Sequence, residues 1–372
     1  MNDEHWMQLA LGLAERVAYI TSPNPRVGCV IVRGGAVIAS GATQEAGGPH
    51  AEIMALMQAR QRDIDVQGAT IYVSLEPCSH YGRTPPCVDA LIAARPGRVV
   101  VAMLDPNPLV AGRGVQRLRE AGIQVTVGLC ANHALAMNPG FVSRMTRRRP
   151  WVWLKLAASL DGRIALPDGQ SKWITSPQAR ADGHAWRARS CAVLTGTGTV
   201  ACDDPQLNVR DVLTPRQPVR VVVDSNFAIS EKARLFDGGK VIVFTCTAND
   251  EKAMRLADRN VQVVSLPSRD GKVDLMAMMH WLGANDINEV HVEAGARLSG
   301  ALLGAGCVDE LVVYLAPLLL GEGIGMVNFP TLSSLTDALR FELIDHQAIG
   351  PDLRLRVRSS QSWQSLQNSL IV

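Results

Sequence analysis

The sequence lacks the features that would direct the protein to a membrane, to the cell exterior or to a polyanion. No apolar run approaches the ~20 residues that a membrane-spanning helix needs. The N-terminal residues MNDEHWMQLA are acidic where a signal peptide is basic. The formal net charge is only +2, so no broad basic surface for nucleic acid is expected. We therefore expect a cytoplasmic protein whose partner is neither a membrane nor a nucleic acid; assembly into a homo-oligomer is left open.

The eight cysteines do not form the regular framework of a disulfide-rich secreted protein. They are scattered among strand-like segments, as Cys29, Cys130, Cys191 and Cys246 show. Scattered thiols of this kind are typical of a reducing compartment, where they serve as small core residues. Cys78 and Cys87 are the exceptions, because they flank a short polar segment.

The length of 372 residues favours two domains. The basic run Arg144–Arg149 ends at Pro150, and we interpret it as a solvated linker rather than as a site for a substrate phosphate. This interpretation predicts one domain over residues 1–146 and a second over residues 147–372.

Both predicted domains alternate helices with strands, which indicates the α/β class. In the first, Arg33-Gly34-Gly35 predicts a hairpin turn. Its expected helices are 6–20, 50–60, a helix after Cys87 and 112–121, and its expected strands are 27–32, 36–40, 69–75, 98–103 and 123–127. In the second, the expected strands are 151–157, 191–195, 219–224, 240–245, 261–266, 289–294, 309–316, FELIDHQAIG and DLRLRVRS, with helices near 177–189, 251–259, 273–283 and 297–305.

Three residues of the first domain have the chemistry and the context of zinc ligands. His50 opens a predicted helix, Cys78 follows a strand in a Glu-Pro-Cys turn, and Cys87 immediately precedes a helix. The positive end of a helix dipole favours the thiolate that zinc requires. Three protein ligands leave the fourth position to a water molecule, whose pKa zinc lowers toward neutrality.

Glu52, two residues after His50, lies on the same predicted helical turn and is not needed as a ligand. It can take a proton from the water and pass it to a departing amine. The pattern matches the zinc-deaminase signature H-x-E followed by P-C-x-x-C, except that eight residues separate Cys78 from Cys87. The alternative is a surface histidine with two structural cysteines, and the occurrence of all four residues in this order disfavours it.

The first domain resembles the deaminase domain of the RibD family of bifunctional riboflavin-biosynthesis proteins. The resemblance rests on PCSHYGRTPPC, PNPRVG from Pro23, the HAE block and DPNP from Asp105 followed by VAG. It implies a cytidine-deaminase-like three-layer sandwich that removes a ring amine from a phosphorylated diaminopyrimidine. Asn24 would hold the pyrimidine or ribose, and His80, Arg83 and Thr84 the 5′-phosphate.

The second domain contains a glycine pattern that resembles a dinucleotide-binding motif, Gly196-Thr197-Gly198 with Ala201. Asp224 ends a later strand, where a ribose-binding acid would stand. We reject a Rossmann assignment, because Asp204-Pro205 should prevent the crossover helix that such a motif opens. The glycines would still allow a ligand to approach the backbone closely.

Two further segments of the second domain indicate a ligand. In VEAGARLSG, a strand ends in Glu293-Ala294-Gly295 and the next residues open a helix. Backbone amides at this helix start could hold a phosphate, although a plain tight turn explains the pattern equally well. In LKLAASLDGRIALPDGQSKWITS, a strand that contains Lys155 leads to a polar loop with an exposed Trp173. Arg187, in the helix that follows, is a candidate phosphate anchor.

These segments resemble the reductase domain of the RibD family, which is similar to dihydrofolate reductase in fold; the resemblance covers about 147–358. It implies NADPH contacts and substrate contacts, with Arg187 and Arg210 on the substrate phosphate. Lys155 and Asp203 are candidates for the group that polarises or protonates the sugar. The implied NADPH contacts are Ala157, Trp173, Thr199, Asp203, Ser225, Gly295, Ala296, Arg297, Leu298, Ser299, Gly300 and Ala301. The implied substrate contacts are Ser171, Arg187, Leu207, Arg210 and Glu293.

The sequence therefore predicts a zinc deaminase followed by an NADPH reductase, both acting on one phosphorylated pyrimidine, so that a ribosyl group ends as ribityl. One alternative is a deaminase of a nucleoside or transfer RNA with a second domain that only binds; the near-neutral charge argues against a polynucleotide. Another is a zinc-stabilised scaffold without catalysis, which would need a fourth protein ligand. Only His80 is available for that near the Cys78–Cys87 segment.

Overall fold

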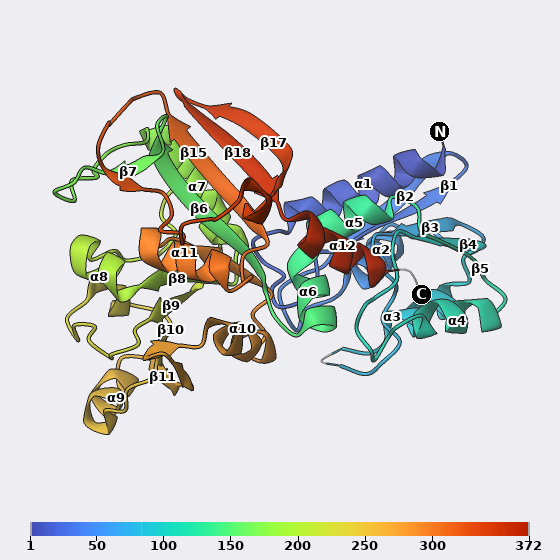
Figure 1. The fold of residues 1–372 in the computed structure, drawn as a ribbon. Coiled ribbons are helices and arrows are strands. Elements are labelled where there is room, and N and C mark those ends of the chain that lie inside the picture. The colour runs from blue at the N-terminus through green and yellow to red at the C-terminus, as the bar shows by residue number, and fades with distance from the viewer. Residues whose placement is uncertain (1, 83, 371–372) are drawn as a thin grey trace. The chain divides into compact units, whose positions relative to one another are not determined.

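The computed structural model describes residues 2–82 and 84–370, and the chain forms two compact units (Figure 1). The first unit comprises the residues up to Arg148 together with the C-terminal segment from Ser365, and the second is Arg149–Gln364. Each unit is built on its own β-sheet with helices against it. The α/β class predicted from the sequence is confirmed.

The first unit contains a five-stranded sheet in the order β2-β1-β3-β4-β5. The predicted hairpin is confirmed: β1 and β2 pair antiparallel, and Gly34 and Gly35 between them have φ of 59° and 74°, a conformation that favours glycine. β1 is also antiparallel to β3, whereas β3, β4 and β5 are parallel. The strands are β1 Gly28–Arg33, β2 Ala36–Ala42, β3 Thr70–Val73, β4 Arg98–Val101 and β5 Gln124–Val127.

Two glycines show that helices cover both faces of this sheet. A Cβ on Gly28 would lie 1.9 Å from the Ala10 carbonyl oxygen of helix α1, and one on Gly41 would lie 2.5 Å from the Ala51 carbonyl oxygen of α2. Gly41 pairs with Cys29, which points to the face opposite Gly28. α1 and α2 therefore lie on opposite faces, as in a three-layer sandwich. The helices are α1 Asp3–Arg16, α2 Ala51–Gln61, α3 Cys87–Ala94, α4 Arg113–Glu120, α5 Ala131–Met137 and α6 Pro139–Arg147.

The basic run before Pro150 is not the solvated linker that the sequence suggested. Helix α6 continues to Arg147. The Arg149 side chain is 8% exposed as a residue, and its Nη2 lies 2.9 Å from Oδ1 of Asp309. A buried guanidinium with a carboxylate partner is part of the packed interior. Composition alone predicted solvation because it cannot show the partner, which lies 160 residues further along the chain.

The second unit contains a nine-stranded sheet in the order β11-β10-β9-β8-β14-β6-β15-β18-β17. The seven strands from β11 to β15 in this order are parallel, and β18 and β17 are antiparallel at one edge. The strands are β6 Trp151–Ser159, β8 Ala192–Gly196, β9 Val219–Val223, β10 Val241–Thr245, β11 Val261–Ser265, β14 Glu289–Val292, β15 Glu310–Ala316, β17 Glu342–Ile349 and β18 Asp352–Arg358.

Apolar residues fill both faces of the larger sheet. Val221 of β9 belongs to one buried cluster, with residues of α10 and α11, and its neighbour Val222 belongs to another, with Leu256 of α9. Successive strand residues point to opposite faces, so a near-continuous apolar strand is what two covered faces require. The remaining elements are α7 Pro177–Arg189, α8 Thr197–Asp203, α9 Asp250–Ala257, α10 Leu275–Ala284, α11 Ala296–Gly304, α12 Ser360–Asn368, η1 Arg234–Phe236, η2 Leu335–Asp337, β7 Arg163–Ala165, β12 Ser268–Arg269, β13 Lys272–Val273 and β16 Ile324–Gly325.

The prediction that no helix follows the Gly196 motif is wrong. Gly196 caps the seven-residue helix α8, which ends where Asp204 takes a left-handed conformation with φ of 41°. Pro205 therefore stops the helix after about two turns but does not prevent it, because a proline excludes helix only around its own position.

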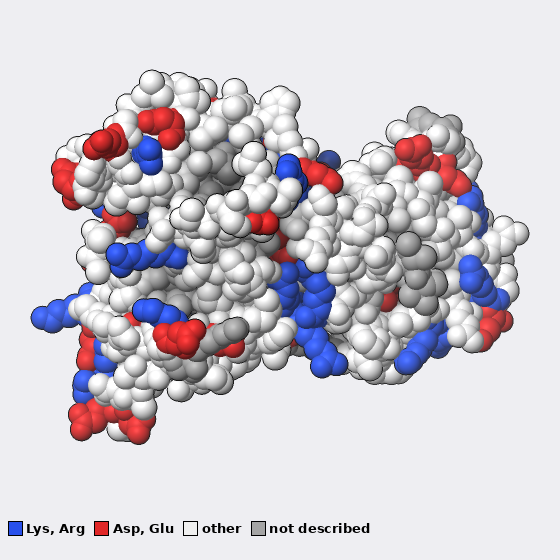
Figure 2. Space-filling view, in the orientation of Figure 1, with Lys and Arg blue, Asp and Glu red and all other residues white. Residues whose placement is uncertain are grey.

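None of the helices within the described residues has both the length and the apolar character needed to cross a membrane. On the face drawn in Figure 2, acidic and basic side chains occur in small groups of both signs among a majority of other residues.

Candidate metal centre and ligand cavity

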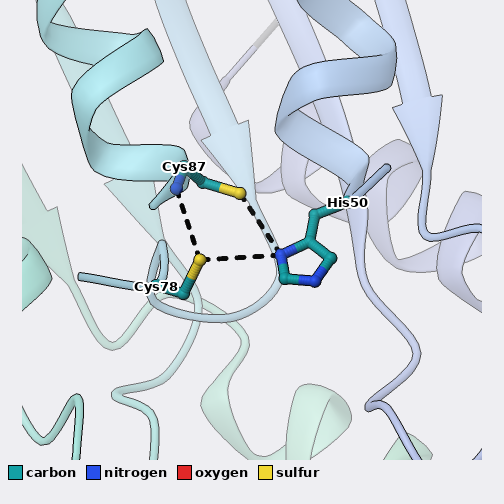
Figure 3. Close-up of side chains that lie close together, drawn as sticks. All are labelled: His50, Cys78 and Cys87. Atoms are coloured by element: carbon teal, nitrogen blue, oxygen red, sulfur yellow. Dashed lines mark hydrogen bonds between the residues drawn. The ribbon is translucent and has the colours of Figure 1, made fainter. Parts of the chain in front are cut away.

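The three predicted metal ligands lie together in the first unit, pointing toward one another (Figure 3). His50 is the N-cap of α2, Cys87 is the first residue of α3, and Cys78 lies in the loop after β3. The Nδ1 atom of His50 is 3.6 Å from the Cys78 sulfur and 3.3 Å from the Cys87 sulfur. All three ligand atoms lie within 4.8 Å of one another.

These distances fit a tetrahedral zinc ion. With Zn–S of about 2.3 Å, Zn–N of about 2.05 Å and a tetrahedral angle, the sulfur and nitrogen ligands of one ion lie about 3.6 Å apart. Two thiols and one imidazole are also the donor types that zinc prefers. Among the described residues, His50, Cys78 and Cys87 form the one group of three or more His, Cys, Asp or Glu side chains that is close enough to hold a metal ion.

The site supplies one ready thiolate. The hydrogen bond with the Cys87 thiol, with help from the His50 ring and from the Cys87 backbone N–H at 3.3 Å, lowers the pKa of Cys78 to about 4. The same hydrogen bond, together with burial, raises the pKa of Cys87. A proton shared between two thiols in this way is released when a cation binds both sulfurs.

Glu52 lies in the first turn of α2 and is 3% exposed. Burial, and then the neighbouring Cys78 sulfur, raises the pKa of Glu52 to about 7, and its carboxyl also forms a hydrogen bond with Cys87. A carboxyl group whose pKa is close to the working pH is suited to accept and donate a proton. Its position beside the sulfur ligands is what a proton shuttle needs.

Glu76 is a residue of this site that the sequence reasoning missed. Its carboxylate accepts backbone N–H groups of Asp105 at 3.1 Å, Gly112 at 2.9 Å and Val115 at 3.1 Å. It thereby ties the Glu-Pro-Cys turn to the start of α4. A Cβ on Gly114 would lie 2.1 Å from the Pro77 carbonyl oxygen, so the contact is close. The sequence signal for Glu76 is its position directly before Pro77-Cys78, and we interpreted Glu76 only as part of that turn.

Of the four residues predicted to bind the deaminase substrate, the structure describes Asn24, His80 and Thr84, and no hydrogen bond joins these three. Asn24 is half-buried, and its backbone N–H donates to the Thr21 carbonyl. The Nδ1 atom of His80 is buried without a hydrogen-bond partner among the described residues. Thr84 is half-buried and its carbonyl accepts the Gly82 N–H. Arg83 lies outside the described residues.

The second unit contains a cavity of about 940 Å³. The elements around it include β6, β7, the end of β8, α8, β13, α11, β16 and the loops that follow β9 and β14. Twelve residues that the resemblance assigned to cofactor, substrate or catalysis line it: Lys155, Ala157, Ser171, Thr199, Asp203, Ser225, Glu293, Gly295, Ala296, Arg297, Leu298 and Ala301.

An ion pair stands beside this cavity. Nε and Nη2 of Arg187 donate to the two carboxylate oxygens of Glu293 at 2.5 and 2.8 Å, and Nη1 donates to the Asn208 carbonyl at 2.9 Å. Burial alone would raise the pKa of Glu293, but the Arg187 guanidinium outweighs it and holds that pKa well below the usual range. Burial also lowers the pKa of Lys155. Arg187 is thus already engaged, which the sequence could not show.

Five other predicted contacts do not line the cavity. The Trp173 ring is 68% exposed and stacks on Arg180 at 4.2 Å from its centroid. Leu207 and Ser299 are buried, and a Cβ on Gly300 would lie 1.9 Å from the Asn328 carbonyl oxygen. The exposed Arg210 donates from Nη1 to the Asn208 side chain at 2.6 Å. Ser299 and Gly300 therefore serve the packing of α11.

The backbone around the cavity suits a phosphorylated cofactor. A Cβ on Gly198 would meet nothing within 4 Å, and one on Gly295 only the Thr199 hydroxyl at 3.9 Å, so a ligand can approach both positions closely. Gly295 is also the N-cap of α11, and no capping side chain accepts a hydrogen bond from the first N–H groups of this helix. The first N–H groups of a helix are suited to bind a phosphate.

Comparisons with known proteins agree with both sites. Residues 150–355 match the family model "RibD C-terminal domain", and residues 1–103 match "Cytidine and deoxycytidylate deaminase zinc-binding region". The riboflavin biosynthesis protein RibD of Escherichia coli K12 is 47% identical over 370 residues, which is 96% of this chain and 99% of the relative.

Two solved structures are similar over the same length. Acinetobacter baumannii RibD, form 1, has a TM-score of 0.89 and 44% identity, covering 96% of this chain and 99% of that one. A diaminohydroxyphosphoribosylaminopyrimidine deaminase/5-amino-6-(5-phosphoribosylamino)uracil reductase from Thermotoga maritima has a TM-score of 0.85 and 34% identity, covering 96% and 98%. The cofactors are zinc for the deaminase domain and NADPH for the reductase domain. The chain belongs to the RibD family, the bifunctional deaminase and reductase proteins of riboflavin biosynthesis.

Proposed function

We propose that this chain deaminates a diaminohydroxyphosphoribosylaminopyrimidine and then reduces the ribosyl group of the resulting uracil to ribityl. The relative from Thermotoga maritima carries these two activities in its name. We assign the deaminase to residues 1–146 and the reductase to residues 147–372, although the segment from Ser365 belongs to the first compact unit. All eight cysteines are free thiols, which supports the cytoplasm as the compartment.

The observation that carries the deaminase proposal is the meeting of His50, Cys78 and Cys87 beside the buried Glu52 carboxyl. Zinc held by these three residues supplies the Lewis acidity that activates a water molecule. Glu52 takes the proton of that water as its oxygen adds to the ring carbon that bears the amine. It then delivers the proton to the amine nitrogen, which leaves as ammonia.

In the reductase, bound NADPH supplies the hydride. Lys155 and Asp203 both line the cavity, and Asp203 is 3.1 Å from Lys172 Nζ. Burial lowers the pKa of Lys155 and so makes its ammonium a better proton donor than an exposed lysine. We assign it the proton that the ribose ring oxygen takes up as C1′ is reduced. The N–H groups of Arg187 that do not contact Glu293 or Asn208, together with Arg210, would bind the substrate phosphate.

The test replaces Glu52 with Gln, which keeps the shape of the side chain but cannot shuttle a proton. The variant should retain zinc, lose deamination by a factor of about 10² or more, and still reduce substrate that is supplied already deaminated. Cys87→Ser should lose zinc, whereas Cys130→Ser, at a half-buried cysteine that accepts from Gln8 at 3.6 Å, should keep it. Normal deamination by Glu52→Gln, or full zinc occupancy of Cys87→Ser, would remove the residue concerned from the mechanism.

A further inference from the structure

The cavity of the second unit extends across neighbouring strands of the sheet. Lys155 comes from β6, Glu293 directly follows β14, Gly196 ends β8, and Ser225 lies two residues after β9, and all four line the cavity. These four strands are consecutive in the sheet. Three strand spacings of about 4.8 Å separate β6 from β9, so the cavity spans about 14 Å between its ends. A dinucleotide fits such a space only when it is extended along the sheet edge.

The two ends of the cavity differ in chemistry. The end at β6 and β14 holds Lys155 and Glu293, with Arg187 beside them, which are the groups suited to the reacting sugar. If the proposed reduction is correct, the nicotinamide lies at this end. The adenosine end of the cofactor must then lie at β9, near Ser225 and Asn226.

Three cationic side chains line the cavity among those that the structure describes: Lys155, Arg297 and Lys272. Lys155 stands at the reacting end. Arg297 is in the first turn of α11. This helix start lies near the middle of the cavity, beside the end of β8, because a Cβ on Gly196 would lie 3.0 Å from Leu298 Cδ2. Among the side chains that the structure describes, Lys272 is therefore the cation that lines the adenosine end.

A short hairpin fixes Lys272 beside Ser225. Strands β12 and β13 pair antiparallel through Asp270-Gly271, whose φ values of 54° and 71° form a tight left-handed turn. The Val273 N–H donates to Ser225 Oγ at 3.1 Å, so the residue after Lys272 is bonded directly to the loop that follows β9. Because Ser225 Oγ acts as acceptor in this contact, its own hydrogen remains available to donate to an anion.

Two acidic side chains close to this end of the cavity accept hydrogen bonds from backbone donors, whereas Asp270, in the hairpin turn two residues before Lys272, is exposed. Asp224 is 3% exposed and accepts the Ile229 N–H at 2.7 Å. Asp274 caps α10 by accepting the N–H groups of Met276 and Ala277, both at 2.9 Å. In NAD-binding sites a carboxylate at the end of the corresponding strand binds the ribose hydroxyls and repels a 2′-phosphate. Here Asp224 stands at that place and lines the cavity, but it is almost fully buried and one of its carboxylate oxygens is occupied by the Ile229 N–H of its own loop.

We propose that Lys272, assisted by the Ser225 hydroxyl, binds the adenosine 2′-phosphate and so selects NADPH over NADH. Lys272 is exposed, and its ammonium makes no ion pair with an acidic residue within the described part of the chain. A lysine on a short hairpin, with a hydroxyl donor adjacent, is a simple arrangement for recognising a dianionic phosphate. This inference rests on the proposed use of NADPH and adds the residue that reads its extra phosphate.

The test measures binding of NADPH and NADH to the full-length protein by titration calorimetry, without substrate. Lys272→Ala should weaken NADPH binding about tenfold and change NADH binding less than about twofold, since a charge-assisted contact of this kind is worth roughly one factor of ten. Lys272→Arg should keep most of the preference. Lys240→Ala is the matched control, because Lys240 is exposed and directly precedes β10, at the opposite end of the strands from the cavity.

The fragments 2′,5′-ADP and 5′-AMP isolate the adenosine end, and the wild type should prefer the first by a larger factor than Lys272→Ala does. Equal loss of NADPH and NADH affinity in Lys272→Ala, or an unchanged preference, would overturn the role of Lys272 while leaving the reductase assignment intact. Absence of NADPH binding to the wild type would instead overturn both. Unfolding temperatures of the variants should match the wild type, which separates loss of binding from loss of folding.

Discussion

Removing one partner of the Arg187–Glu293 ion pair should destabilise the second unit strongly. The two side chains are 14% and 17% exposed, and their contacts of 2.5 and 2.8 Å are bidentate. At a charge separation of about 4 Å and an effective dielectric constant of about 20, the attraction is about 4 kcal/mol. Glu293→Gln leaves the Arg187 guanidinium largely buried without its counter-charge, so we expect a loss of about 3 kcal/mol in the free energy of unfolding.

Tryptophan fluorescence during urea unfolding of the full chain is a suitable assay, because six of the seven tryptophans lie in the second unit and only Trp6 in the first. Arg187→Met should cost about 2 to 3 kcal/mol, less than Glu293→Gln, because Lys155 and His291 remain near the Glu293 carboxylate. The double variant should be more stable than the sum of the single losses by about 2 kcal/mol.

The difference in unfolding free energy between the wild type and Glu293→Gln should depend on pH, because the pKa of Glu293 is lowered in the folded protein. Below the unfolded value of about 4.3, the unfolded chain binds a proton that the folded chain still lacks, so the contribution of the pair is lost as pH falls. The gap between wild type and Glu293→Gln should therefore be full at neutral pH and shrink in acid. Additive single losses, or a gap that widens in acid, would refute the reasoning.

Three further outcomes test other parts of the structure. Gly28→Ala should destabilise the first unit by about 2 kcal/mol or more, because its Cβ would lie 1.9 Å from the Ala10 carbonyl oxygen of α1. Gly12→Ala, within α1 itself, has open space around its Cβ and should stabilise that helix by about 0.5 to 1 kcal/mol; calorimetric unfolding that ranks the two variants the other way would contradict this packing. Glu76→Gln should weaken zinc binding about tenfold in chelator competition, and unchanged affinity would mean that the turn holds without the carboxylate. Alkylation of the exposed Cys202, which lines the cavity, should be slowed by NADPH in peptide mapping, and an unaffected rate would place the cofactor elsewhere.

The sequence predicted local structure best where one physical signal dominates. Arg33-Gly34-Gly35 predicted the observed hairpin because only glycine takes its positive φ values without strain. The helix expected from residue 6 begins instead at Asp3, because the Asn2 side chain accepts the His5 N–H and caps it earlier. Apolar periodicity reports which face is buried and says nothing about a cap that lies before the first apolar residue.

Features that depend on contacts far apart in the sequence were missed. Arg149 appeared to belong to a solvated basic run because Asp309 is distant in the chain. The engagement of Arg187 by Glu293 bridges 106 positions and changes how a phosphate could bind there. Glu76 gave no periodic signal, since its role is to accept three backbone N–H groups from another segment. The meeting of His50, Cys78 and Cys87 was predicted because helix starts and a strand end constrain where each side chain can lie.

The most direct test of the account is mass spectrometry of the diaminohydroxyphosphoribosylaminopyrimidine after incubation with the zinc-loaded protein, with and without NADPH. Without NADPH, the ring amine should be replaced by oxygen and the sugar should remain closed. With NADPH, two further hydrogens should appear, and only on the deaminated molecule. Unchanged substrate under both conditions would contradict the pyrimidine assignment and make deamination of a nucleoside the leading alternative.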